Sequence, residues 1–200
     1  MPATTAQPRA PASASGLVAR GGGLDQVAVA TGLNLNGAAV YVAPIAISYR
    51  SPAAAGTQPL GFRNRTLDAD ALARLNDTVA QAFAERFLAP RGARLVSSAD
   101  AADYTLHLRL DDFFLPAPLQ QTTRLREVFS EHTAYGTLSG SLSDSRGRVA
   151  LQFRDRREFG ESFANLSSDR LKLFSPPAFW ADMRTDLRRA FSSLDRSLRY

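Results

Sequence analysis

The chain has 200 residues, 44% of them hydrophobic and 22% charged, which is the composition of one ordinary globular domain. It contains no cysteine, and this excludes disulfides, thiolate metal sites and a cysteine nucleophile. The net charge is +5, and all but one of the 24 basic residues are arginine. Acidic residues lie among these arginines, so the pattern predicts a solvated surface of mixed charge.

Residues 1–23 have the composition of a flexible tether. Small and polar residues dominate this stretch, and proline recurs at Pro2, Pro8 and Pro11. Such a segment buries too little apolar surface to offset the entropy lost on ordering. We therefore expect a tether over residues 1–23 and a single folded domain over residues 24–200. The sequence has no run of ~20 apolar residues that could span a membrane, and its N-terminus lacks the basic and apolar regions of a signal peptide.

The next segments predict one strand between two irregular stretches. Residues 24–35 form a short extended lead-in and turn, and residues 50–65, which are rich in proline and glycine, form a loop. Residues 38–49 are apolar almost throughout, which is typical of a strand covered on both faces. Pro44 cannot donate a hydrogen bond to a neighbouring strand, so this strand lies at an edge or bulges there.

Residues 67–89 predict the clearest helix of the chain. Its apolar residues recur on one face of a 3.6-residue period: Leu72, Leu75, Val79, Phe83 and Phe87. Thr66 or Asp68 caps its first turn, and Pro90 and Gly92 end it.

The middle of the domain predicts two strands and one ambiguous segment. Residues 93–98 form a short strand, and residues 103–112 alternate strictly between apolar and polar side chains, as in a half-exposed strand. Residues 113–115 are all apolar and break this alternation. Residues 120–135 fit either one or two helical turns or a strand.

The last third predicts a hairpin and a helix. Residues 136–158 alternate on both sides of a turn at residues 144–147, in which Gly147 takes the left-handed conformation. Residues 159–172 form a polar, mobile segment. Ser175 caps the final helix, whose apolar stripe comprises Trp180, Met183, Leu187, Phe191, Leu194 and Leu198. This stripe packs against the sheet face that it shares with Val79 and Phe83.

The order of elements is thus β-α-β-β-x-β-β-α, where x is the ambiguous segment. It predicts an α+β fold with a single antiparallel or mixed sheet of about five strands and two helices packed on one face. The polar side of the strand over residues 103–112 then forms the open face.

That open face carries the first candidate chemistry. His107, Arg109 and Asp111 share its polar side, and one alternative function is a small enzyme with its site at these residues. Asp112 follows directly, but adjacent carboxylates in an extended strand point to opposite faces and cannot form an acid–base pair without a bulge. A lone histidine with no partner motif is more typical of a solvated surface residue. No nucleophile elbow, phosphate-binding loop or dinucleotide fingerprint is present.

Two further clusters contain charged residues. His132 follows Glu127 and Glu131, and the three could offer metal ligands on a helix, but a zinc site needs three or four ligands in a tighter motif. Arg154, Arg156 and Arg157 suggest a second alternative function, a module that binds an anionic surface such as lipid or nucleic acid. Only Phe159 lies near them as a possible stacking residue, and this disfavours nucleic acid.

Four segments together resemble a known family. They are Val-Tyr-Val-Ala-Pro at residues 40–44, Ala-Asp-Tyr-Thr-Leu at residues 102–106, the hairpin at residues 144–149 and the final helix that contains Trp180. In this order they are similar to a family of Gram-negative envelope lipoproteins known only as a domain of unknown function, over residues 38–198. The resemblance implies an envelope location, a linker after a lipid anchor, and no known catalytic residues. This chain lacks the lipobox and its cysteine, so two explanations stay open: a cytoplasmic protein, or a mature exported protein in which Met1 replaces the acylated cysteine. The tether favours the second.

The expected function is that of a non-enzymatic periplasmic domain of an outer-membrane lipoprotein, acting through contacts with an envelope protein. The membrane is reached through an N-terminal lipid anchor that this chain does not contain. We expect no catalytic residue, no cofactor and no metal.

Overall fold

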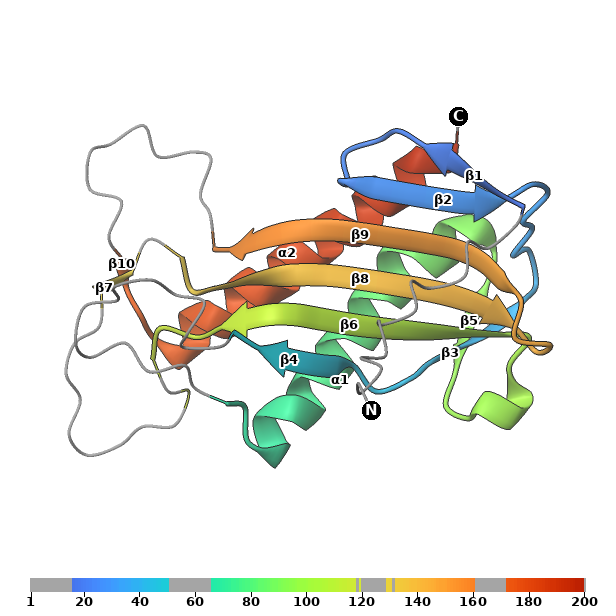
Figure 1. Ribbon diagram of the computed structural model, residues 1–200. Coiled ribbons are helices and arrows are strands. Elements are labelled where there is room, and N and C mark those ends of the chain that lie inside the picture. The colour runs from blue at the N-terminus through green and yellow to red at the C-terminus, as the bar shows by residue number, and fades with distance from the viewer. Residues whose placement is uncertain are drawn as a thin grey trace, which may run out of the picture.

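The computed structural model describes residues 16–50, 66–117, 119, 129–130, 132–160 and 172–199. Within these residues, one eight-stranded mixed sheet carries both long helices on one face (Figure 1). The sheet consists of β1 (Leu17–Arg20), β2 (Gln26–Ala30), β3 (Ala39–Val42), β4 (Ala46–Tyr49), β5 (Arg94–Val96), β6 (Tyr104–Phe114), β8 (Ala134–Asp144) and β9 (Val149–Phe159). The predicted fold class is confirmed, with about three more strands than expected.

The sheet has an antiparallel half and a parallel half. Its strand order is β1-β2-β9-β8-β6-β3-β5, and β4 also pairs with β6. Strands β1, β2, β9, β8 and β6 are antiparallel neighbours, whereas β3, β4 and β5 make parallel pairs. The chain therefore returns through a helix between β4 and β5, as parallel strands require.

Pro44 explains why the predicted strand over residues 38–49 is two strands. Residues 43–45 separate β3 from β4, although Ala43 N still donates to the Leu106 carbonyl of β6 at 2.9 Å, and both strands pair with β6 at different points along its length. The freed Ile45 N–H donates to Asn76 Oδ1 of the first helix at 2.8 Å. The sequence predicted one strand with an edge position or a bulge at Pro44; the structure instead has a break between two strands, and a side chain satisfies the Ile45 N–H.

The first helix, α1 (Ala69–Phe83), begins at the predicted cap. Asp68 accepts a hydrogen bond from Ala71 N at 2.7 Å. The helix continues through a π-helical turn, η2 (Ala84–Leu88), and a 3-10 turn, η3 (Ala89–Arg91), and ends at Gly92 in the left-handed conformation. The wider π turn buries the consecutive residues Phe87 and Leu88 together.

The second helix, α2 (Pro176–Ser197), is capped by Ser175 as predicted. It buries five residues of the predicted stripe, while Leu198 is half-buried. Phe191 contacts the Phe83 ring of α1 edge-on at 5.1 Å and the Phe153 ring of β9 at 6.3 Å. The stripe therefore joins both helices to the sheet, as the sequence predicted.

Strand β1 differs from the sequence prediction. Leu17–Arg20 fall within the expected tether, yet they pair with β2 at the edge of the sheet. The glycine turn that follows lies against α2, where Ser197 Oγ donates to the Gly22 carbonyl at 2.9 Å. The remainder of the expected tether, residues 1–15, lies outside the described residues.

The ambiguous segment is partly described. Phe129–Ser130 form β7, which pairs with β10 (Lys172–Leu173) in a separate two-stranded sheet, and Ala134 onward belongs to β8. Residues 120–128 and most of the polar segment before β10 lie outside the described residues, as does the predicted loop over residues 51–65. A short 3-10 turn, η4 (Ala99–Ala101), precedes β6. None of the described helices is long and apolar enough to cross a membrane.

Candidate functional site

The face of the sheet opposite the helices is polar, and its side chains follow from the strand register. Across β6, β8 and β9, Arg109 lies beside Ser139 and Arg154, while His107 lies beside Ser141 and Gln152. Because side chains alternate along a strand, these rows share one face. The hydroxyl residues of β8 are half-buried in the centre, and the long charged side chains on both sides are exposed. We call this surface the open face.

The candidate residues on β6 all lie on this face, where Arg109 forms an ion pair with Asp111 and lines the same hollow as His107. Arg109 Nη2 lies 3.1 Å from Asp111 Oδ1, which also accepts a hydrogen bond from Ser48 Oγ at 2.9 Å. His107 makes no hydrogen bond or ion pair with any other residue in the described ranges. It is exposed at a hollow of about 810 Å³ that is also lined by Arg109, Ser141 and Gln152.

A β-bulge changes the expected placement of Asp112. The register shifts between Asp111 and Phe114, and Asp112 has a φ of 53°. Two consecutive carboxylates therefore both lie on the open side, whereas an unbroken strand would separate them. The same bulge explains the apolar run after it, because Phe113, Phe114 and Leu115 are all buried.

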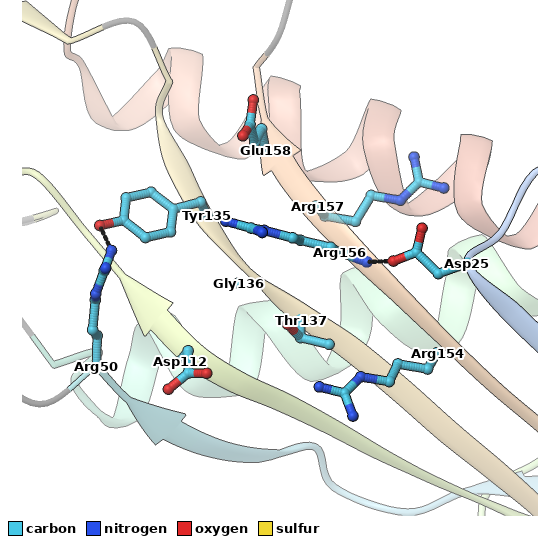
Figure 2. Close-up of a pocket in the computed structure, with 10 residues that line it drawn as sticks. All are labelled: Asp25, Arg50, Asp112, Tyr135, Gly136, Thr137, Arg154, Arg156, Arg157 and Glu158. Carbon is cyan, nitrogen blue, oxygen red and sulfur yellow. Dashed lines mark hydrogen bonds between the residues drawn. The ribbon is translucent and has the colours of Figure 1, made fainter. Parts of the chain in front are cut away.

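Next to this bulge lies a second hollow of about 450 Å³, which we call the arginine hollow (Figure 2). Figure 2 shows that its side chains come from β2's leading turn, from the end of β4 and from β8, β9 and the bulge of β6. Its lining comprises Asp25, Arg50, Asp112, Tyr135, Gly136, Thr137, Arg154, Arg156, Arg157 and Glu158. The guanidinium groups of Arg50, Arg154 and Arg156 thus lie near three carboxylates, those of Asp25, Asp112 and Glu158, around one hollow.

The arginines of this hollow are of two kinds. Arg157 forms an ion pair with the buried Asp155, and Arg50 donates to Tyr135 Oη while lying 5.3 Å from the centre of the same ring. Arg154 and Arg156 are exposed, and neither guanidinium is paired with a carboxylate of the described residues. In Figure 2 both side chains extend from β9 across β8, Arg156 toward Tyr135 and Arg154 past Thr137.

Two aspartates, Asp25 and Asp155, form hydrogen bonds at the backbone of β9 beside these arginines. Asp25 Oδ2 accepts from Arg156 N at 2.8 Å, and Asp25 N donates to Asp155 Oδ1 at 3.3 Å. This fixes the backbone of β9 where the ladder with β2 has ended. Burial raises the pKa of Asp155 above its usual range, although the Arg157 guanidinium acts in the opposite direction.

The residues weighed as metal ligands around His132 are only partly described. His132 Nε2 lies 3.5 Å from Glu158 Oε2, whereas Glu127 and Glu131 lie outside the described residues. Among the residues that the structure does describe, no three histidine, aspartate or glutamate side chains form a group that could hold a metal ion.

Sequence reasoning identified Arg154, Arg156 and Arg157 but not their surroundings. Arg50 and Asp25 come from distant segments, and only the sheet topology brings them to β9. The break in alternation at residues 113–115 was the one local signal of the bulge that adds Asp112.

No protein-family model matches this chain, and no curated protein matches it in sequence. Solved structures do match it. A PelC dodecamer from Paraburkholderia phytofirmans is 16% identical, with a TM-score of 0.44, covering 84% of this chain and 96% of that one. Protein XCC0632 from Xanthomonas campestris, of family DUF330, is 14% identical, with a TM-score of 0.38 and coverage of 82% and 85%. A putative neuraminyllactose-binding hemagglutinin homolog from Helicobacter pylori is 9% identical, with a TM-score of 0.42 and coverage of 83% and 89%.

These similarities concern the fold alone. The structural neighbours include PelC and a protein of family DUF330.

Proposed function

We propose that this chain is a non-enzymatic domain of the cell envelope, held at the outer membrane, which binds another protein through the open face of its sheet. One observation carries the proposal. Both long helices cover the same face of the described sheet (Figure 1), and the opposite face presents exposed polar and charged side chains. In this proposal the N-terminal arm, before the domain, tethers it to the membrane.

The composition of the open face supports binding over a purely structural role. The small hydroxyl side chains of β8 in the middle of the face are half-buried, whereas the longer side chains of β6 and β9 on both sides of them project into solvent. The face therefore has a trough along β8. Such a trough matches the contour of a partner segment laid along or across the strands, and its polar groups offer hydrogen bonds that a partner can use.

A photo-crosslinking experiment in the native cells tests this function. A photoreactive amino acid replaces Gln152 at the centre of the open face, or Arg184 on the exposed side of α2 as the matched control. We expect a discrete crosslinked protein in the outer-membrane fraction from position 152 and none from position 184. Crosslinks from position 184 alone, or none from either position, would contradict the proposal, provided that the variant accumulates as the wild type does.

A further inference from the structure

We propose that the arginine hollow binds the carboxylates of an extended acidic segment of a partner protein, through Arg154 and Arg156. This inference rests on the proposed function, because it names the chemistry of one contact that the open face makes.

The spacing of the two arginines favours an extended peptide. Arg154 and Arg156 are two residues apart on β9 and share one face, so their Cα atoms are separated by about 7 Å along the strand. Alternate residues of an extended peptide have the same separation. Two acidic side chains at positions i and i+2 of such a segment therefore reach both guanidinium groups without distortion of either chain.

The lack of a carboxylate partner for these two guanidinium groups also favours an acidic ligand. Elsewhere in the described structure, several arginines are satisfied by carboxylates, such as Arg91 by Asp195, Arg148 by Asp144 and Arg188 by Glu85. Arg154 and Arg156 have no such partner within the described residues. Each instead lies next to a hydroxyl on β8, with Ser139 opposite Arg154 and Thr137 opposite Arg156. A guanidinium fork beside a hydroxyl donor is suited to a carboxylate.

The border of the hollow argues against a broad anionic surface. Asp25, Asp112 and Glu158 line the same hollow as the arginines. A lipid bilayer or a nucleic acid would press a continuous array of phosphates against these carboxylates, which costs energy through like-charge repulsion. A single peptide can place its carboxylates at the two arginines and leave the carboxylates of the hollow in solvent.

Binding of two synthetic peptides to the full chain tests the proposal. One fluorescent peptide alternates Glu and Thr over five residues, and the other has the same composition with its three Glu residues contiguous. Fluorescence anisotropy at low salt is measured for the wild type, for the double variant R154S/R156S, and for R86S/R184S. The last variant loses the same charge from exposed positions on the helical side.

We expect the alternating peptide to bind more tightly than the contiguous one. The R154S/R156S variant should lose at least about tenfold in affinity for it, whereas R86S/R184S should stay within about twofold of the wild type. Equal losses in both variants would show a general charge effect and overturn the proposal. So would vesicles containing phosphatidylglycerol that bind through Arg154 and Arg156 while the peptides do not.

The peptide-binding result and the photo-crosslinking result can fail independently of each other. Crosslinking from position 152 that persists while neither peptide binds removes only the acidic-segment inference. Peptide binding that depends on Arg154 and Arg156, without any crosslink in cells, supports the hollow as a site and counts against the envelope partner.

Discussion

At Gly22 the backbone meets α2 so closely that a side chain has no room. A Cβ atom there would lie 2.8 Å from Ser197 Cα, and the residue has a φ of 149°. Gly22→Ala should therefore lower the free energy of unfolding by about 1–3 kcal/mol. Urea denaturation measures the change. The neighbouring Gly21 has open space around it, so Gly21→Ala should stay within about 1 kcal/mol of the wild type; equal losses at both positions would contradict the close packing.

Two aspartates should give opposite dependences of stability on pH. Burial raises the folded pKa of Asp155, so its stabilising contribution is complete below the ordinary pKa and is lost as the pH rises through the folded pKa. Hydrogen bonding from the Arg148 backbone N–H lowers the folded pKa of Asp144, so its contribution is present above the ordinary pKa and is lost as the pH falls through the folded pKa.

Each pH dependence is measured as the difference in the free energy of unfolding between the wild type and the matching Asn variant. Upward from about pH 4, the stability advantage of the wild type over Asp155→Asn should shrink. Its advantage over Asp144→Asn should shrink in the other direction, downward from about pH 4. Unfolding free energies at several pH values measure both slopes, and two slopes of the same sign would refute the assignments.

At this scale, local chemistry was predictable and distant contacts were not. Asp68, Ser175 and Gly147 have the conformations that the sequence predicted, because a cap or a turn depends on neighbours within four residues. The requirement for glycine at Gly22 depends on Ser197, which is far away in the sequence. A single sequence contains no signal of that contact.

At the scale of elements, α2 holds the domain together. Leu187 is 2% exposed in the middle of the stripe between α1 and the sheet. Leu187→Ala should cost about 2–5 kcal/mol, because it removes buried methyl groups and leaves a cavity. Arg184→Ala, on the exposed side of the same helix, should change stability by less than about 0.5 kcal/mol. Thermal or urea unfolding of the two variants would contradict this account if Arg184→Ala were the more harmful.

The bulge of β6 gives a second prediction for an element. Among the residues that the structure describes, Asp112 is the one non-glycine residue with a positive φ. A β-branched side chain is poorly tolerated in that backbone conformation. Asp112→Val should destabilise the domain by about 1–2 kcal/mol, whereas Asp112→Gly should be as stable as the wild type or more so. Chemical denaturation distinguishes the two, and a tolerated valine would mean that the strand runs through without a bulge.

The elements that the sequence predicted best are those with long periodic patterns. Helix α2 and the β8–β9 hairpin agree with their predictions because many residues repeat one period. Strand β1 was assigned to the tether because four residues beside a glycine run have no measurable period. Its strand conformation comes from pairing with β2, which is a tertiary effect.

At the scale of the whole molecule, the one-sided packing of the helices was predictable, whereas the arrangement of the site was not. Two amphipathic helices and alternating strands require one covered and one open face. The arginine hollow, in contrast, depends on β4, β8, β9 and the turn before β2 lying at the same part of the sheet. That arrangement depends on strand order, which the sequence left open.

Cysteine labelling in intact cells tests the central claim, that the open face binds a partner in the envelope. The chain has no cysteine, so Gln152→Cys and Arg184→Cys each introduce one reactive thiol, on the open face and on α2 respectively. The reagent is a small maleimide that enters the periplasm but not the cytoplasm. The account predicts that Cys at position 184 is labelled as fast in cells as in the purified domain, while Cys at position 152 is protected in cells alone. Equal labelling of both positions in cells would contradict the open-face contact, and no labelling of position 184 in cells would contradict the envelope location.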